Sequence, residues 1–170
     1  MKHILIGITS GIAAYKIIDL IKLLQKEKYE IEVVLTKSAA QMVDVGNIED
    51  ITRKKVHVDL FTQNFNYKEV LVSREVEHVK LADWADIVVV APATANTIAK
   101  FAHGIADDFL TTTLLATTAP ILICPSMNVH MWENSATQEN LSIVQKRGVH
   151  ILYPDSGALA CGYTGVGRLP

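Results

Sequence analysis

Apolar and polar residues alternate along the chain in blocks that predict strands followed by helices. An apolar run at residues 3–8 meets a Thr-Ser-Gly turn, and apolar residues then recur at helical spacing over residues 12–25. Further runs of strand length, most of them rich in β-branched residues, lie at residues 31–35, 86–91, 121–124 and 149–153. The pattern therefore predicts at least five strands that alternate with helices.

The stretches between these strands have helical patterns. One helix is expected to begin near Ser38, and others are expected at residues 79–85, 94–103, 107–117 and 137–146. Strand–helix alternation is typical of parallel sheets, and the near-continuous valines of residues 86–91 fit a strand covered on both faces. We expect an α/β fold, with a single doubly wound parallel sheet in a flavodoxin- or Rossmann-like three-layer sandwich.

Two segments lack a regular pattern. Residues 59–74 are polar and aromatic without clear periodicity, and residues 157–167 contain four glycines in eleven positions. We expect both to be mobile loops. No repeat or linker-like tract interrupts the pattern, so residues 1–170 are expected to form one domain.

Composition and charge exclude several classes of function. Charged residues make up 20 % of the chain against a typical ~25 %, which leaves a mild apolar surplus. The net charge is −2, so no domain-wide basic field is present to bind nucleic acid. The apolar run at residues 87–97 is shorter than the ~20 residues of a membrane helix, and the N-terminus lacks a signal-peptide pattern. We expect a cytoplasmic protein without a membrane or nucleic-acid partner.

Turns with glycine and hydroxyl residues follow the first two predicted strands, where ligands bind in doubly wound folds. Gly7 and Gly11 have G-x-x-x-G spacing and not the dinucleotide G-x-G-x-x-G, which counts against NAD(P). The hydroxyls of Ser10, Thr36 and Ser38 could bind one phosphate, or they could be ordinary helix N-caps.

The third and fourth strand ends are also unusual. Small residues at 91–97 would let a flat ring approach the backbone, and Asn96 could bind a ligand or cap a helix. Asn128 lies between Met127 and Met131, next to Trp132; methionine and tryptophan side chains of this kind more often belong to a core than to a cofactor site.

One cysteine and one histidine are candidates for proton transfer. Cys161 lies in the glycine-rich segment and is expected to be accessible, whereas Cys124 ends an apolar strand. A thiol with a pKa near ~8.5 is mostly protonated at neutral pH and could donate a proton. His78 precedes a predicted helix and could equally be a surface or capping residue. Two cysteines without a CxxC motif indicate neither a disulfide framework nor a metal site.

Four motifs together resemble the homo-oligomeric flavin-containing cysteine decarboxylases, over essentially the whole chain. They are Ser-Gly-Ile-Ala-Ala-Tyr-Lys at residues 10–16, Ala-Pro-Ala-Thr-Ala-Asn-Thr at 91–97, P-x-M-N-x-x-M-W at 125–132 and an Ala-Cys-Gly loop within 159–168. The third is specific to the superfamily. The Ala-Cys-Gly loop narrows the resemblance to the branch that decarboxylates 4′-phosphopantothenoylcysteine in coenzyme A biosynthesis.

The resemblance implies FMN as cofactor and a role for individual residues. His78 would act as base for the substrate thiol or orient it, Asn128 would bind the substrate carboxylate, and Cys161 would donate a proton. Contact with FMN is implied for Ser10, Gly11, Ile12, Thr36, Lys37, Ser38, Thr94, Ala95, Asn96, Thr97 and Ser126. Contact with the substrate is implied for Asn128, Met131 and a flap of Ala158, Leu159 and Ala160.

The resemblance also implies the reaction and the partners. FMN would oxidise the substrate thiol to a thioaldehyde, carbon dioxide would leave to give an enethiolate, and reduced FMN would return the electrons to form 4′-phosphopantetheine. The protein would be a homo-oligomer, a trimer or a dodecamer of trimers, with FMN between subunits. A phosphopantothenate–cysteine ligase would be fused to it or separate.

Other functions stay open beside this one. A peptidyl-cysteine decarboxylase that acts on the C-terminal cysteine of a precursor peptide shares the Met-Asn motif. A non-catalytic FMN-binding regulatory subunit of a protein phosphatase is a remote alternative, since His78, Asn128 and Cys161 are all present. A generic flavodoxin-like electron carrier would have no use for the Met-Asn and Ala-Cys-Gly motifs.

Overall fold

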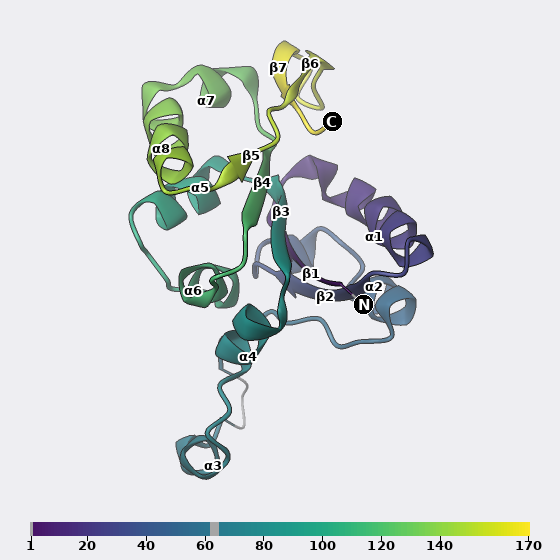
Figure 1. The fold of residues 1–170 in the computed structure, drawn as a ribbon. Coiled ribbons are helices and arrows are strands. Elements are labelled where there is room, and N and C mark those ends of the chain that lie inside the picture. Colours follow the sequence, from purple (N-terminus) through teal and green to yellow (C-terminus); the bar gives the residue numbers. More distant parts are fainter. Residues whose placement is uncertain (1, 62–64) are drawn as a thin grey trace.

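The computed structural model describes residues 2–61 and 65–170, and its centre is a five-stranded parallel sheet (Figure 1). Its strands are β1 (His3–Ile8), β2 (Glu30–Leu35), β3 (Ile87–Ala93), β4 (Ile121–Pro125) and β5 (His150–Ile151). They lie in the order β2-β1-β3-β4-β5 and all neighbours pair in parallel. This is the doubly wound, flavodoxin-like order, so the expected fold class is confirmed.

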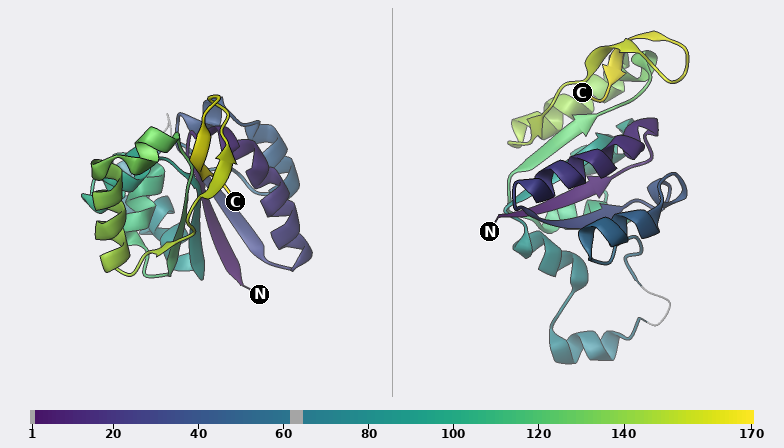
Figure 2. Two further views of the ribbon diagram at one scale, coloured as in Figure 1. Left: turned by 90° about the horizontal axis from the view of Figure 1, so that it is seen from above. Right: turned by 90° about the vertical axis from the view of Figure 1, so that its right-hand side faces the viewer.

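Helices form a layer on each face of the sheet (Figure 2). One layer holds α4 (Glu77–Trp84), α5 (Ala95–Ala102), α6 (Phe109–Ala116) and α8 (Ser135–Lys146). The other holds the 3-10 turn η1 (Ile12–Lys16), α1 (Ile17–Lys26), the 3-10 turn η2 (Ala39–Gln41) and α2 (Val45–Thr52). The remaining elements are α3 (Tyr67–Ser73), α7 (Val129–Glu133), β6 (Asp155–Ala158) and β7 (Thr164–Arg168).

Strand residues divide alternately between two cores. Leu5 packs with Val88 on the face covered by α5 and α6, where Phe109 is almost fully buried. The neighbours of Leu5 in β1 point to the opposite face, where Ile6 packs with Ile17 of α1. Since side chains alternate along a strand, a sheet buried on both faces needs apolar residues at nearly every position. This explains part of the apolar surplus.

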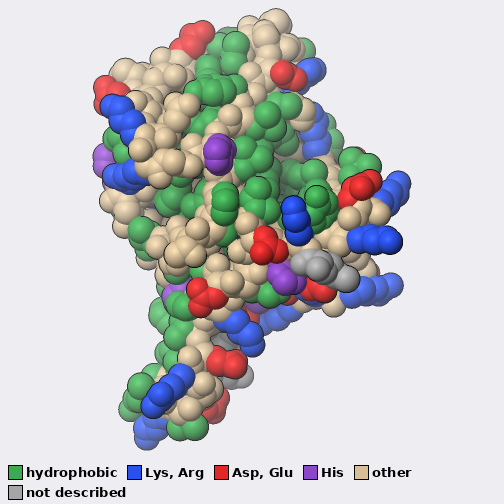
Figure 3. All heavy atoms as spheres, viewed as in Figure 1, with side chains coloured by type: hydrophobic (Ala, Val, Ile, Leu, Met, Phe, Trp, Pro, Cys, Tyr) green, Lys and Arg blue, Asp and Glu red, His purple; other side chains and the backbone are tan. Residues whose placement is uncertain are grey.

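The second face of the sheet is covered only in part. The helices α1 and α2 pack over β1 and β2, while Leu152, just beyond β5, is 46 % exposed on that side. An apolar groove of about 620 Å³ lies there between α1 and the strands. Figure 3 shows hydrophobic side chains gathered over the middle of this view. The groove is lined by side chains that include Leu20, Ile87, Val89 and Leu122.

The segment at 59–74 is not irregular throughout, because α3 forms within it. Asn66 caps this helix by accepting a hydrogen bond from the Lys68 N–H at 3.1 Å. The helix lies apart from the body of the molecule (Figure 1), buries none of its residues, and leaves Leu71 71 % exposed. A helix without a buried face has no amphipathic pattern, which is why the sequence did not predict it. Residues 62–64 of that segment lie outside the described residues.

The segment at 157–167, expected to be a mobile loop, contributes strand residues to the antiparallel hairpin of β6 and β7. Two of its four glycines, Gly165 and Gly167, allow close packing. A Cβ on Gly165 would lie 2.8 Å from a methyl group of Val129, and a Cβ on Gly167 would overlap the carbonyl oxygen of Met127. The Met127 N–H donates to the Gly167 carbonyl at 3.0 Å. The hairpin is therefore fixed to the segment between β4 and α7.

Smaller differences concern helix starts. The helix predicted at residues 12–25 begins as the 3-10 turn η1, and the one predicted near Ser38 is only the short turn η2. The helix α4 begins at Glu77, so His78 lies in its first turn instead of before it. The short helix α7 was not predicted, because five residues are too few to show a period.

Replacing Gly167 with alanine should detach the hairpin from the segment between β4 and α7. The residue has a φ of +152° and no room for a Cβ, so we expect the Met127 amide to lose its partner and exchange its hydrogen faster. Hydrogen–deuterium exchange with peptide mass spectrometry measures this. The matched control is Gly157→Ala in β6, where a Cβ would make ordinary contact with Arg168 at 3.4 Å. Equal protection of Met127 in both variants would contradict the role given to Gly167.

Candidate functional site

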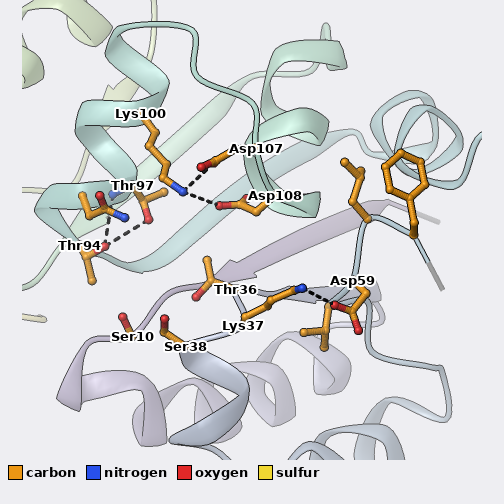
Figure 4. A pocket seen from close by; sticks show the side chains of 14 residues that line it. Ser10, Thr36, Lys37, Ser38, Asp59, Thr94, Thr97, Lys100, Asp107 and Asp108 are labelled. Carbon is orange, nitrogen blue, oxygen red and sulfur yellow. Dashed lines mark hydrogen bonds and ion pairs between the residues drawn. The ribbon is translucent and has the colours of Figure 1, made fainter. Parts of the chain in front are cut away.

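Two adjoining cavities open at the carboxyl edge of the sheet, and both border Ser10 and Thr94. The first, here called the polar cavity, has a volume of about 450 Å³ and lies between η2, the residues after α2, and the starts of α5 and α6 (Figure 4). The second, here called the hairpin cavity, has a volume of about 590 Å³ and lies beneath the β6–β7 hairpin. Their place is the one where doubly wound folds bind ligands.

Hydroxyl groups from three strand ends point into the polar cavity (Figure 4). Thr36 and Thr94 accept hydrogen bonds from backbone N–H groups of the following helical turns, at 3.2 and 3.3 Å, so both act as caps. In the described chain, Ser38 makes no capping hydrogen bond, and the N-cap of η1 is Gly11 and not Ser10. The hydroxyls of Ser10 and Ser38 are therefore available to a ligand.

Charged groups in the polar cavity form two local sets. Lys37 lies 3.0 Å from Asp59, and both side chains are more than half exposed. Lys100 donates to Asp107 at 2.6 Å and to Asp108 at 3.1 Å. The bond to Asp107, aided by Asp108, raises the pKa of Lys100 despite partial burial. Lys100 is thus committed to its carboxylates, whereas the exposed pair of Lys37 is weak enough to exchange for another anion.

The hairpin cavity is lined by small and apolar groups around one polar pair. Its floor comes from Gly11 and Ala95, and Met131, which is 49 % exposed, faces it from α7. A Cβ on Gly11 would lie 2.9 Å from Pro92, so this position has to be a glycine. The sequence favoured core positions for Met127, Met131 and Trp132. Met127 and Trp132 do pack against the core on the α5 and α6 face of the sheet, whereas Met131 does not.

Asn128 and Cys161 form the polar pair of the hairpin cavity. The Asn128 carbonyl oxygen accepts from the His130 N–H at 2.8 Å and caps α7. The amide orientation is therefore fixed, with its NH₂ group directed to Cys161 Sγ at 3.2 Å. This hydrogen bond lowers the pKa of the exposed Cys161 thiol. Cys124 is buried, and burial raises its pKa to about 11, so the expected contrast between the two cysteines is confirmed.

His78 lies away from both cavities. It occupies the first turn of α4 and meets the ring of Phe109 edge-on, with 6.3 Å between ring centroids. Burial lowers the pKa of its imidazole. A neutral imidazole at neutral pH can accept a proton. Within one chain, however, the structure does not bring His78 to Asn128 and Cys161.

The other predicted site residues do come together. The polar cavity includes Ser10, Thr36, Lys37, Ser38, Thr94, Asn96 and Thr97. The hairpin cavity includes Ser10, Gly11, Ile12, Thr94, Ala95, Ser126, Asn128, Met131, Ala158, Leu159, Ala160 and Cys161. Asn96 is not a helix cap, because Thr94 caps α5.

Several lining residues were missed by the sequence interpretation. The charged ones are Asp59, Lys100, Asp107 and Asp108 in the polar cavity, and Lys16 and Arg168 in the hairpin cavity. One signal was present, because Asp108 precedes a helix as an N-cap aspartate does. Lys100 lies in a different helix from Asp108, and no sequence pattern indicated that the two side chains would meet.

Comparison with known proteins identifies the family. The sequence model of the family described as Flavoprotein matches residues 1–170. The chain belongs to the flavoprotein family. Among the residues that the structure describes, this flavoprotein has no helix with the length and apolarity to cross a membrane.

Relatives of this flavoprotein include bifunctional enzymes. It is 44 % identical over 168 residues to the coenzyme A biosynthesis bifunctional protein CoaBC of Bacillus subtilis, and equally to that of Haemophilus influenzae. Each alignment covers 99 % of this chain and 40 % of the relative. The chain therefore spans well under half the length of these relatives.

Solved structures of related proteins share the fold. The FMN-dependent cysteine decarboxylase SpaF superposes with a TM-score of 0.83 at 31 % identity, covering 99 % of this flavoprotein and 90 % of SpaF. A PPC decarboxylase mutant complexed with pantothenoylaminoethenethiol superposes with a TM-score of 0.82 at 28 % identity, covering 99 % of this chain and 91 % of that one.

The contact between Asn128 and Cys161 can be tested by alkylation. Replacing Asn128 with alanine removes the donor that lowers the Cys161 pKa, so we expect iodoacetamide to modify Cys161 more slowly at neutral pH. Peptide mass spectrometry over a pH series measures the rate. Cys124 is the internal control, since its burial should keep it unmodified in both proteins. An unchanged pH profile for Cys161 would refute the contact.

Proposed function

We propose that residues 1–170 form an FMN-binding decarboxylase domain that converts 4′-phosphopantothenoylcysteine to 4′-phosphopantetheine in coenzyme A biosynthesis. The observation that carries this is the Asn128–Cys161 pair, 3.2 Å apart in a cavity beneath the hairpin. It occurs in a chain that is 44 % identical to CoaBC proteins over 99 % of its length. A cytoplasmic location accords with that pathway.

The two cavities fit FMN in chemistry and in size. Hydroxyls of Ser10, Thr36 and Ser38 and the exchangeable ammonium of Lys37 suit a phosphate. The small residues of the hairpin cavity let a flat ring approach the backbone, and the two volumes lie within the ~300–1,000 Å³ of ligand pockets. We infer that FMN is held by Ser10, Gly11, Ile12, Thr36, Lys37, Ser38, Thr94, Ala95, Asn96, Thr97 and Ser126.

When bound, FMN would supply a two-electron acceptor for the substrate thiol and return the electrons after carbon dioxide has left. Asn128 binds the departing carboxylate with a neutral N–H donor. A lysine or arginine in its place would stabilise the anion of the ground state and oppose its loss as neutral carbon dioxide. The fixed orientation of the Asn128 amide keeps an N–H directed into the cavity throughout.

Cys161 supplies the proton that completes the product. In the free protein the Asn128 N–H lowers the Cys161 pKa. A substrate carboxylate that takes over this N–H removes the cause of the lowered pKa, which leaves Cys161 as a thiol able to donate. Ala158, Leu159 and Ala160 cover the substrate as a flap, and Met131 lines its binding site.

His78 is supplied to this site by a second subunit. It faces neither cavity of its own chain, although its pKa, lowered by burial, suits a base for the substrate thiol. We propose a homo-oligomer, a trimer or a dodecamer of trimers, in which FMN lies between subunits. The apolar groove beside β3, β4 and β5 is a large unfilled apolar surface of the kind that subunit contacts bury.

A peptidyl-cysteine decarboxylase is the second candidate, because the likeness to SpaF, an FMN-dependent cysteine decarboxylase, does not by itself select the coenzyme A substrate. The higher identity to CoaBC proteins favours the coenzyme A substrate. Since CoaBC proteins are bifunctional by name and much longer than this chain, we also propose a phosphopantothenate–cysteine ligase as a fused or separate partner.

Turnover tests the proposed roles of Asn128 and Cys161. Purified protein should be yellow and should release carbon dioxide from 4′-phosphopantothenoylcysteine without added reductant, as followed by mass spectrometry. In Asn128→Asp an oxygen remains to cap α7, but the carboxylate repels the substrate, so we expect the rate of turnover to fall by about a hundredfold or more.

In Cys161→Ser the substrate should lose carbon dioxide, and the reaction should stop at an oxidised enethiol.

Matched variants separate chemistry from folding in this test. Asn134→Asp changes another capping asparagine, which accepts from the Ala136 N–H at 3.0 Å at the start of α8. Cys124→Ser changes the buried cysteine. Both should turn over the substrate within about twofold of the parent. A colourless protein, or full activity of Asn128→Asp, would refute the function or the role of Asn128 respectively.

Subunit exchange tests the origin of His78. His78→Gln and Cys161→Ser should each complete little product alone, because each site lacks one group. In mixed oligomers some sites receive His78 from one chain and Cys161 from the other, so product formation should exceed the sum of the two separate variants. Light scattering reports the oligomer, and tagged subunits report exchange. Verified exchange without any gain would show that His78 acts within its own chain or not at all.

A further inference from the structure

We propose that His57 is a positioning residue, which holds the first turn of α4 and thereby His78 through the contact of its imidazole Nδ1 with the Glu77 carboxylate, 3.0 Å away. The inference rests on the proposed function, because it concerns the residue assigned there as base. Neither His57 nor Glu77 lines the polar cavity or the hairpin cavity. Any effect of these two side chains on the reaction is therefore indirect.

The backbone of His57 is fixed to the edge of the sheet. Its N–H donates to the Val33 carbonyl at 3.0 Å, and its carbonyl accepts from the Leu35 N–H at 2.8 Å. The side chain is only 10 % exposed and stacks on Phe109, with 5.3 Å between ring centroids. Both the backbone and the ring of His57 are thus held in place, so a contact with this ring can fix the position of a neighbouring element.

The imidazole of His57 lies between two carboxylates. Its Nε2 is 3.6 Å from Glu32 Oε2, and its Nδ1 is 3.0 Å from Glu77 Oε1. Carboxylates only accept hydrogen bonds. Within the described chain the buried Nδ1 has no well-aligned hydrogen bond. The charge of Glu77 is therefore the main compensation for burying this atom.

The opposite side of the cluster keeps Glu32 ionised. Although burial alone would raise the Glu32 pKa, the neighbouring His57 and Lys54 side chains bring it below its usual range. Lys54 lies 3.0 Å from Glu32 and 3.5 Å from Glu30, with its ammonium 4.7 Å from the centre of the Trp84 ring. The cluster thus links β2 to both ends of α4.

Among the residues that the structure describes, no other charged side chain contacts the start of α4 in this way. Its N-cap is Val76, which makes no capping hydrogen bond, and the chain before it leads to the exposed helix α3. Glu77 is the first residue of α4 and His78 is the second. Phe109, which stacks on His57, also meets the edge of His78. The Phe109 ring and the Glu77–His57 contact therefore hold the first turn of α4, in addition to the core packing of Leu81 and Ala82 further along the helix.

Glutamine variants of the pair test this inference. We expect His57→Gln and Glu77→Gln each to lower kcat by between about tenfold and a hundredfold, with KM and FMN content nearly unchanged. The double variant should be no worse than the single ones, because both remove the same contact. The matched control is Glu75→Gln: Glu75 faces the same side but pairs with Lys80, at 3.4 Å, and not with His57. It should stay within about twofold of the parent.

A second readout does not depend on turnover. Ring carbon signals of the six histidines can be followed by NMR, with His78→Gln used to assign the signal of His78. That signal should shift and broaden in His57→Gln and Glu77→Gln but not in Glu75→Gln. Glu77 is 48 % exposed, so its variant should fold even if His57→Gln is destabilised, and thermal melting of each protein checks this.

The outcomes separate this inference from the proposed function. An unshifted His78 signal in folded Glu77→Gln overturns the positioning role of His57, whatever the activity. Strictly additive losses in the double variant would also overturn it. If the parent protein does not decarboxylate the substrate, or if His78→Gln is fully active, the proposed function or the role of His78 fails, and the NMR signal alone decides whether His57 holds α4.

Discussion

A parallel sheet has to be covered on both faces, and this constraint organises the molecule. Each strand returns to the same side through a helix, so the turns after β1, β2, β3 and β4 meet along one edge. Those turns carry Ser10, Ser38, Thr94 and Asn128, which lie far apart in the sequence. The two cavities follow from how the sheet is buried, and the identity of the turn residues determines what they bind.

Within one chain, the helices cover the second face of the parallel sheet only in part. Beside β3, β4 and β5 the sheet leaves an apolar groove, and His78, the proposed base, lines neither cavity of its own chain. Assembly with a second subunit, as proposed above, would answer both observations, because subunit contacts bury apolar surface and a neighbouring chain can contribute a residue to the site.

The sequence predicted what depends on short-range pattern. The strands of the parallel sheet followed from apolar runs, and many of the residues of both cavities followed from turn motifs and from the resemblance they support. Three features were beyond it. The helix α3 has no buried face, Gly165 and Gly167 allow the hairpin to pack closely, and the separation of His78 from Asn128 depends on which way α4 faces. The His57 cluster joins residues 32, 57 and 77, whose ion pairs appear only in three dimensions.

The bond from Lys16 Nζ to the Leu169 carbonyl, at 3.0 Å, joins η1 to the end of β7. The hairpin cavity is lined by residues between 10 and 169. Strands β1 to β4 and the helices that cover them, in contrast, are complete by residue 146. During synthesis, an N-terminal portion of this length can bury its cores before the hairpin has been made. The cores on the two faces of the sheet can therefore form before the hairpin cavity is complete.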